Sequence, residues 1–196
     1  MDKTVPATAV GRTPVRQRLL ETASRLFYAE GIRVVGIDRV LAESGVAKSS
    51  MYVHFRTKED LVVAYLGEHS AWFRANLAEF LAQRKVTGRQ AVLAVFDFMD
   101  LGFSHPGFRG CAFVNAAVEY PSHKEIRQAV AEHRAWLKGQ FADLLPDDVP
   151  DHAGLATALL QLSTGASSSA YVDGDCDAAS RARSTAALLL GLPATA

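Results

Sequence analysis

The chain has 196 residues, of which 49% are hydrophobic and 21% are charged, and its 21 basic residues balance its 21 acidic ones. This is the composition of a globular protein with one domain or two small ones. Two cysteines exclude a disulfide framework, and no cysteine or histidine cluster predicts a metal or another cofactor. With no signal-peptide core and no apolar stretch of membrane-spanning length, we expect a cytoplasmic protein without a membrane partner.

The neutral total hides an uneven distribution of charge along the chain. Residues 1–60 contain ten Lys or Arg against seven Asp or Glu, whereas the remaining residues contain eleven against fourteen. A basic first third on an acidic body is typical of a protein in which one part meets a polyanion.

The first sixty residues predict a short arm followed by three helices. Residues 1–12 are small and polar and are expected to be a disordered arm, with Thr13 as N-cap of the first helix and Pro14 in its first turn. Glycines end the first two helices, and Gly45 is expected to take the left-handed C′ position. Thr57 is expected to cap a fourth helix. The predicted helices cover residues 14–30, 37–44 and 47–53.

The remaining residues also follow helical spacing, and alternation of the kind seen in strands is almost absent. Breaks fall at "SHPGFRG" (104–110), Pro121, "PDDVPD" and "VDGDCD". The sequence therefore predicts an all-α fold with about nine helices, the later six at residues 58–83, 89–103, 111–120, 122–144, 152–171 and 178–191.

A short basic helix that follows another helix and a tight glycine turn describes a helix-turn-helix. In that motif the second helix enters the DNA major groove while its flanks hold phosphates. Lys48 suits a guanine edge or a phosphate, and the short hydroxyls of Ser49 and Ser50 allow close approach to bases. Tyr52 and His54 suit the sugar-phosphate backbone, as does Lys58 at the start of the following helix.

Residues 16–66 resemble the N-terminal domain of TetR-family transcriptional regulators. The matching motifs are "A..LF...G" in the first helix, "GV.K...Y.HF" across the third, and "KEDL" at the start of the fourth. The resemblance implies a dimeric DNA-binding protein, usually a repressor, that a small ligand releases from its operator. One departure is Leu41, which stands where the family commonly has alanine and leaves the angle between the second and third helices open.

The resemblance also implies a division of the chain into a DNA-binding domain over residues 13–57 and a ligand-binding and dimerisation domain over residues 58–196. In the second helix, Ile37 and Arg39 would approach the DNA backbone. The residues expected to contact DNA are Ile37, Arg39, Lys48, Ser49, Ser50, Tyr52, His54 and Lys58.

The larger domain is rich in big apolar side chains, which either pack in a core or line a ligand cavity as in the resembled family. Cys111, Asn115 and Glu119 are spaced four residues apart and share one helical face, which is either a ligand handle or a solvated side. A neutral or cationic apolar effector is expected. The candidate ligand residues are Trp72, Phe96, Met99, Phe103, Cys111, Phe113, Asn115, Glu119 and Trp136.

The last two helices contain the small-residue run "STGASSSA" (163–170) and several leucines. Small residues let helices approach closely, and in the resembled family the last two helices pair with their copies. We therefore expect a homodimer through these helices, because two recognition helices read two half-sites of a palindromic operator.

Three other patterns in the sequence point to different functions. "DGDCD" (173–177) has the first spacing of a calcium loop but lacks its glycine and its final glutamate, so we expect a turn in which Asp177 caps the last helix. A catalytic pair of His105 and Cys111 has no rigid frame or oxyanion site, so we expect no enzyme. A redox sensor that uses Cys111, with Arg109 nearby, stays open as the alternative function.

Overall fold

The computed structural model describes residues 14–193. Within that range the chain forms nine α-helices and no strand, which confirms the predicted all-α fold. The expected disordered arm at 1–12 and the expected N-cap Thr13 lie outside the described residues. Pro14, expected in the first turn, instead occupies the N-cap position of α1.

The helices begin and end within about two residues of their predicted bounds. They are α1 (Val15–Glu30), α2 (Ile37–Ser44), α3 (Lys48–His54), α4 (Lys58–Arg84), α5 (Gly88–Phe103), α6 (Ala112–Glu119), α7 (Lys124–Leu144), α8 (His152–Val172) and α9 (Ala178–Leu189).

Local signals fix two of these ends as predicted. Gly45 ends α2 in the left-handed conformation, with φ of 64°. Thr57 and Asp60 form a reciprocal capping box at the start of α4, in which the Asp60 N–H donates to Thr57 Oγ1 at 3.0 Å and the Thr57 N–H donates to Asp60 Oδ2 at 3.1 Å. These bonds satisfy amides that a helix start leaves without partners.

The cap of α9 differs in detail from the prediction. Asp177 occupies the N-cap position, but its side chain makes no capping hydrogen bond. Its N–H instead donates to the Asp175 carboxylate, and the Arg181 guanidinium forms ion pairs with both acids. The acidic run is therefore a turn tied to the first turn of α9 by Arg181.

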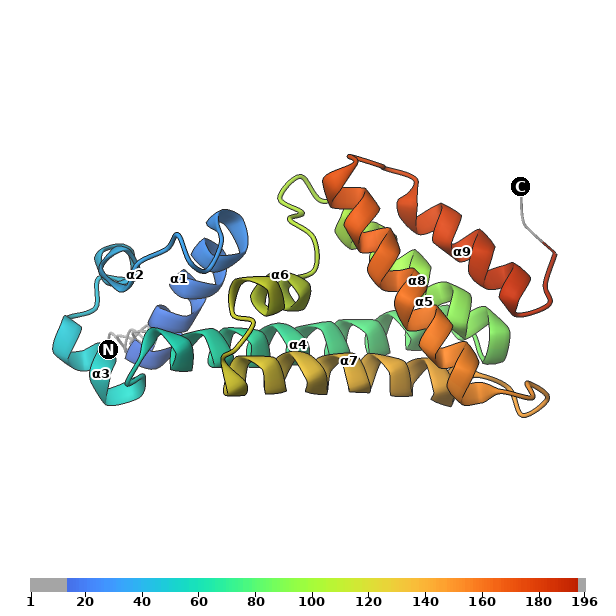
Figure 1. Cartoon of the computed structure of the whole chain (residues 1–196), viewed down its shortest axis with the longest axis horizontal. Coiled ribbons are helices and arrows are strands. Elements are labelled where there is room, and N and C mark those ends of the chain that lie inside the picture. Colours follow the sequence, from blue (N-terminus) through green and yellow to red (C-terminus); the bar gives the residue numbers. More distant parts are fainter. Residues whose placement is uncertain (1–13, 194–196) are drawn as a thin grey trace, which may run out of the picture.

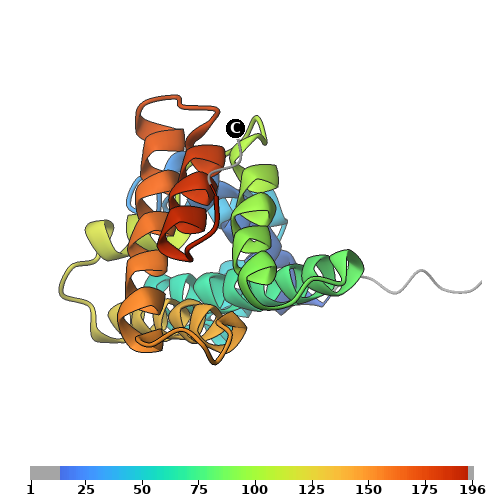
Figure 2. The same cartoon turned by 90° about the vertical axis from the view of Figure 1, so that its right-hand side faces the viewer.

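The helices form an elongated molecule with three parts (Figure 1). The first three helices lie at one end, and α5, α8 and α9 lie at the other. The long helices α4 and α7 pack along each other and connect the two ends, with the short α6 between them. Viewed from the right-hand end, α5, α8 and α9 stand together above the ends of α4 and α7 (Figure 2).

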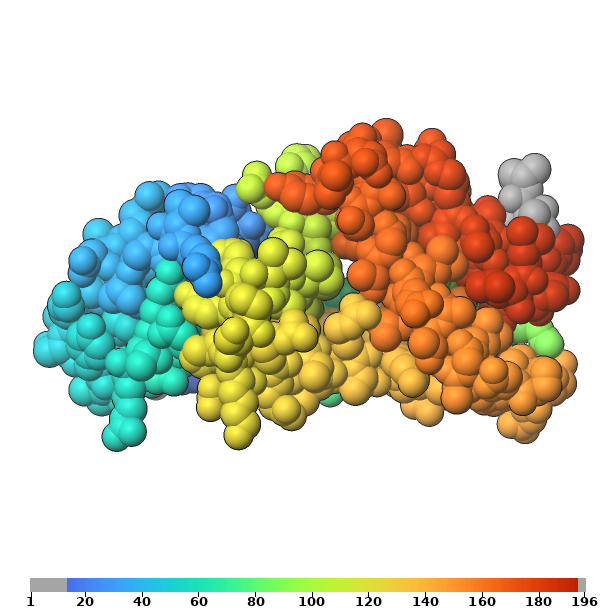
Figure 3. Space-filling view, in the orientation of Figure 1, coloured from blue at the N-terminus to red at the C-terminus, as the bar shows by residue number. Residues whose placement is uncertain are grey.

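Two apolar cores hold this arrangement together. The first joins α1–α3 to the first half of α4, to α6 and to the beginning of α7. The second joins the rest of α4 and α7 to α5, α8 and α9. The expected boundary between residues 57 and 58 therefore falls inside the first core, because Leu61, Val62 and Leu66 of α4 pack directly under the N-terminal helices. The space-filling view shows α6 and the start of α7 filling the region beside the N-terminal helices (Figure 3).

Candidate functional site

Helix α3 has one buried side and one polar, solvent-facing side. Met51 is fully buried and Phe55, directly after the helix, is almost fully buried, so these two side chains anchor α3 to the first core. The side chains of Lys48, Ser49 and His54 are exposed, and Tyr52 is 48% exposed. Ser50 is half-buried.

The N-terminus of α3 is linked to α2 by one exposed ion pair. The Lys48 Nζ lies 3.4 Å from Asp38 Oδ1, and both side chains are largely exposed. Such a pair contributes little to stability, so a phosphate or base edge can replace Asp38 as the partner of Lys48 at small cost. Ile37, at the start of α2, is half-buried and packs against the first core.

Two of the residues expected to contact DNA are engaged within the protein. Arg39 forms ion pairs with Glu43 and Glu30, and Arg25 also pairs with Glu43. Hydrogen bonds from Arg25 and Arg39 lower the pKa of Glu43. Lys58 is half-buried: its Nζ lies 3.5 Å from the Arg33 carbonyl oxygen and 5.9 Å from the centre of the Phe27 ring. Burial lowers the pKa of Lys58.

Three further residues, which were not predicted from the sequence, lie on or beside the solvent-facing side of α3. Val53 is 80% exposed on α3, and Arg56 is exposed between α3 and α4. The Arg16 guanidinium lies 5.3 Å from the centre of the Phe55 ring, which brings a second cation beside α3. The basic residues were visible in the charge count, but only the fold brings Arg16 to α3.

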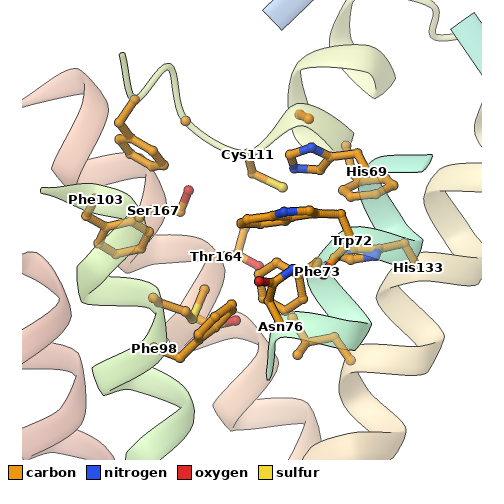
Figure 4. A pocket seen from close by; sticks show the side chains of 18 of the residues that line it. His69, Trp72, Phe73, Asn76, Phe98, Phe103, Cys111, His133, Thr164 and Ser167 are labelled. Carbon is orange, nitrogen blue, oxygen red and sulfur yellow. Dashed lines mark hydrogen bonds between the residues drawn. The ribbon is translucent and has the colours of Figure 1, made fainter. Parts of the chain in front are cut away.

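A cavity of about 580 Å³ lies between α4, α5, α6, α7 and α8, with the segment 104–111 along one side (Figure 4). Its size is within the usual range of small-molecule sites. Five of the nine predicted ligand residues line it: Trp72, Met99, Phe103, Cys111 and Phe113.

The other four predicted residues lie elsewhere. Phe96 is fully buried in the second core and stacks on Phe141. Trp136 lies against Phe73 and His133, with the Arg74 guanidinium over its ring, outside the cavity lining. Asn115 and Glu119 line a separate hollow of about 180 Å³ next to α1. The face that Cys111, Asn115 and Glu119 share is thus split between two sites, because Cys111 precedes the first turn of α6.

Among residues 14–193, three histidines line the cavity, and two of them, His69 and His133, were not predicted from the sequence as site residues. The His133 ring stacks on Phe113 with ring centres 3.6 Å apart, and its Nδ1 lies 3.0 Å from Ser70 Oγ. Burial, assisted by His69, Arg74 and Arg134, lowers the pKa of His133 to about 3. Burial also lowers the pKa of His69. His133 stood on the apolar stripe of its helix in the sequence, which was the one available signal for a buried histidine.

Further cavity residues come from segments that carried no ligand signal. They include Tyr28 of α1, the aromatic rings of Phe73, Phe98 and Phe108, the amide of Asn76, Arg134, and the hydroxyl residues of α8, Ser163, Thr164 and Ser167. Their common feature is a position that faces the space enclosed by five helices, and no short sequence pattern encodes that.

Cys111 is placed on the cavity wall at the N-cap of α6. Burial raises the pKa of its thiol, against weaker opposing effects from the backbone amides of Val114 and Phe113 and from Arg134. The thiol therefore stays protonated near neutral pH, which disfavours attack on an oxidant, because the thiolate is the nucleophile.

Residues around α6 connect the cavity to the N-terminal helices. The Glu119 carboxylate accepts hydrogen bonds from the backbone N–H groups of Ile32 at 3.2 Å and Arg33 at 2.6 Å. Tyr28, which lines the cavity, donates its hydroxyl to the Gly110 carbonyl oxygen at 3.0 Å. Hydrogen bonds therefore join α6 and the segment before it directly to α1 and to the residues that follow it.

Within residues 14–193 no group of three or more His, Cys, Asp or Glu side chains is arranged to hold a metal ion. None of the helices described there combines the length and apolar character needed to cross a membrane.

Comparison with known proteins agrees with these features. Residues 19–65 match the family model described as bacterial regulatory proteins, tetR family. A crystal structure of SCO4454, a TetR-family transcriptional regulator from Streptomyces coelicolor, is 34% identical, with a TM-score of 0.80 over 90% of this chain and 94% of that one. The fold is also similar to that of reduced NemR from Escherichia coli, with a TM-score of 0.81 at 24% identity over 92% of this chain and 99% of that one.

Curated relatives match over the N-terminal part. The transcriptional repressor NemR of Escherichia coli K12 is 30% identical over 105 residues, or 53% of each chain. The transcriptional activator FasR of Mycolicibacterium smegmatis is 32% identical over 88 residues, or 43% of this chain and 40% of FasR. The matched segment spans about half the length of these relatives or less. These relatives are regulators and not enzymes, and the helix-turn-helix, the helical body and the likeness to SCO4454 along most of both chains show that this chain belongs to the TetR family of DNA-binding transcriptional regulators.

Proposed function

We propose that this regulator is a repressor that binds a palindromic operator as a homodimer and leaves it when a small apolar molecule enters the aromatic cavity. The observation that carries this proposal is the polar side of α3, exposed at one end of the molecule and fixed from behind by Met51 and Phe55. The name of NemR as a repressor favours repression, while that of FasR as an activator makes the sign of regulation the first point to test.

The DNA contacts proposed for α3 follow from exposure. Lys48 and Ser49 stand at the N-terminal end of the helix, which is the part of a recognition helix that reads base edges. Tyr52 and His54 stand further along and suit phosphates. The case for DNA contact is weaker for four of the predicted residues. Ile37 and Ser50 are half-buried, and Arg39 and Lys58 are held by partners within the protein.

We propose that residues 13–57 form the DNA-binding domain and that residues 58–196 form the ligand-binding and dimerisation domain. The shared first core supports a coupling of the two parts, since α4 and α6 pack under the N-terminal helices. A protein with this role acts on DNA, so we propose that it works in the cytoplasm.

The proposed dimer interface is formed by α8 and α9. Gly165 and Ser168 are exposed on α8, where their small size allows a partner helix to approach closely. Leu188 and Leu189 of α9 are 61% and 48% exposed, which is unusual for neighbouring leucines and is relieved if a second copy covers them. Dimerisation also doubles the number of bases that the short α3 helices read.

The test begins by selecting bound DNA from a random pool and measuring affinity for the selected site by fluorescence anisotropy. Lys48→Ala removes one groove or phosphate contact from each protomer, and each such contact is worth about 1–3 kcal/mol. We expect the affinity of the dimer to fall by roughly thirtyfold or more. Lys138→Ala, which removes an exposed lysine from α7 in the opposite part of the molecule, is the matched control. Equal affinities of the two variants would contradict the assignment of α3.

A second measurement distinguishes the proposed ligand-responsive repressor from the alternative, a sensor based on oxidation of Cys111. Its raised pKa and its place in the cavity wall favour a role in ligand contact over a reactive thiolate. We expect Cys111→Ser to bind the operator normally, and peroxide to leave operator binding unchanged in both proteins. Release of the unmodified protein by peroxide, abolished in Cys111→Ser but retained in Cys176→Ser, would establish the sensor instead.

A further inference from the structure

The residues that line the cavity indicate which class of molecule it binds. The inference drawn from them rests on the proposed function. Seven of the lining residues are Phe, Tyr or Trp. Trp72 presents its ring to the cavity from α4, beneath Cys111 (Figure 4), and is 57% exposed although it stacks on His69 at a centre-to-centre distance of 6.0 Å. Flat rings with free faces favour a flat aromatic partner.

The charges of the wall distinguish between ligands of the same shape. Among the residues that the structure describes, no Asp or Glu lines the cavity, and Arg134 is the one Lys or Arg that does. His69 and His133 are both kept neutral at physiological pH by burial. A cation in this cavity would lose its water shell, find no carboxylate, and lie near Arg134. The attraction of aromatic faces for cations is smaller than the cost of removing the water shell of an unpaired cation. An anion also loses its water shell, and its one cationic partner in the wall would be Arg134, which already donates to Thr164.

One residue of the wall is mostly buried, and its hydroxyl makes no hydrogen bond within residues 14–193. Ser163 and Thr164 both donate to the Leu160 carbonyl oxygen, and Thr164 also accepts from Arg134. Ser167, 5% exposed and one helical turn further along α8, makes no such bond and lies at the cavity between Phe103 and Cys111 (Figure 4). The hydroxyl is free to donate to a molecule in the cavity, so a ligand that offers it an acceptor gains affinity.

We propose that the effector is an uncharged, planar aromatic compound with a hydrogen-bond acceptor at its edge, and that its ring packs on Trp72 while its acceptor meets the hydroxyl of Ser167. This narrows the neutral or cationic effector expected from the sequence to the neutral class. It also assigns Ser167 as a specificity residue.

Four probes with one naphthalene ring system test the charge and the acceptor separately. They are 2-acetylnaphthalene, which is neutral and has an acceptor, 2-isopropylnaphthalene, which has nearly the same size without an acceptor, 2-naphthoate, and the 2-naphthyltrimethylammonium cation. Isothermal titration calorimetry on the full chain gives their dissociation constants. We expect 2-acetylnaphthalene to bind best, at least about tenfold more tightly than the cation.

The role of Ser167 is tested with a matched pair of variants. Ser167→Ala should weaken binding of 2-acetylnaphthalene by about three- to tenfold and leave 2-isopropylnaphthalene unchanged, because a hydrogen bond contributes about that factor. Ser122→Ala, which changes an exposed serine before α7 and outside the cavity wall, should change neither. Trp72→Ala should weaken both ligands, because the ring face is removed without loss of a core residue.

The outcomes that overturn the proposal are distinct from failure of the proposed function. Tightest binding of the cation or of the naphthoate, equal binding of the two neutral probes, or no binding of any probe would each overturn the assigned ligand class. Operator affinity, measured without any probe, tests the proposed function independently. Loss of DNA binding alongside the expected ranking of probes would refute the regulatory role and leave the ligand class standing.

Discussion

The solvent-facing side of α3 and the wall of the aromatic cavity differ in how far apart their residues lie in the chain. The α3 surface comes from one helix of seven residues, Lys48–His54, with most of its side chains exposed. The cavity draws on residues from Tyr28 to Ser167, which belong to six helices and to the segment between α5 and α6. A change on the first surface should alter DNA binding alone, whereas a change in the second should alter ligand binding, packing and stability together.

Phe113 gives the largest expected contrast between the two regions. Its side chain is 2% exposed, belongs to the first core, lines the cavity and stacks on His133. Phe113→Ala should lower the free energy of unfolding by about 3–5 kcal/mol, since a large ring is removed from a packed site. Val53→Ala, on the exposed side of α3, should change it by no more than about 0.5 kcal/mol. Urea unfolding at one fixed protein concentration measures both, and similar losses would remove the distinction drawn between the regions.

Acid should destabilise the cavity through His133. Its pKa is lowered to about 3 in the folded protein, so between that value and the ordinary histidine value near 6.5 the unfolded chain binds the additional proton. The contribution of His133 to the free energy of unfolding is therefore fully present above about pH 6.5. It decreases as the pH falls, by about 2 kcal/mol between pH 7 and pH 5.

The comparison that isolates this effect uses two histidine variants. His133→Gln should show a shallower loss of stability from pH 7 to pH 5 than the unmodified protein, although His69, whose pKa is also lowered, keeps part of the slope. His54→Gln, on the exposed side of α3, should follow the unmodified protein. Denaturant midpoints at several pH values provide the measurement, and identical slopes for all three proteins would argue against a neutral, buried His133.

Glu119 tests the connection between the two regions. Glu119→Ala removes the acceptor of the Ile32 and Arg33 amides, which should cost about 1–3 kcal/mol and speed hydrogen exchange at those two amides. Glu79→Ala removes an exposed glutamate that accepts one bond from Gln83, and it should leave exchange near α1 unchanged. Protection of Ile32 and Arg33 that survives in Glu119→Ala would mean that α6 does not hold the end of α1.

The smallest expected effect concerns the start of α4, which joins the α3 surface to the cavity. Thr57→Ala removes the capping oxygen and should cost about 1 kcal/mol of stability, whereas Thr57→Ser keeps that oxygen and should cost much less. Thermal unfolding of the two variants measures this difference. A Thr57→Ser loss as large as that of Thr57→Ala would show that the capping bond is not what the hydroxyl contributes.

The elements of this fold were predictable because their signals are local. Helical spacing, the glycine after α2 and the threonine before α4 each act within a few residues, and the corresponding helix ends lie where they were expected. The side chains of the α3 surface were predictable for the same reason, since burial of Met51 and Phe55 leaves its other positions exposed.

The cavity could be predicted only in part. Trp72, Met99, Phe103, Cys111 and Phe113 were identified as large or reactive side chains in an apolar region, but the same reasoning selected Phe96, which packs fully inside the second core. Hydrophobicity indicates that a side chain is buried. It does not indicate whether neighbouring side chains pack against it or leave a cavity beside it. The contacts of Glu119 could not be predicted either, because its hydrogen-bond partners Ile32 and Arg33 lie more than eighty residues away in the sequence.

The sequence by itself determined that this protein is helical, carries a helix-turn-helix, and resembles TetR-family regulators, because hydrophobic period, capping and turn chemistry depend on near neighbours. The tertiary structure decided that α6 joins the N-terminal core, that two neutral histidines line a cavity without carboxylates, and that Arg39 and Lys58 are engaged within the protein. Those features depend on which surfaces meet when helices pack, and that is settled by the shape and volume of many distant side chains together.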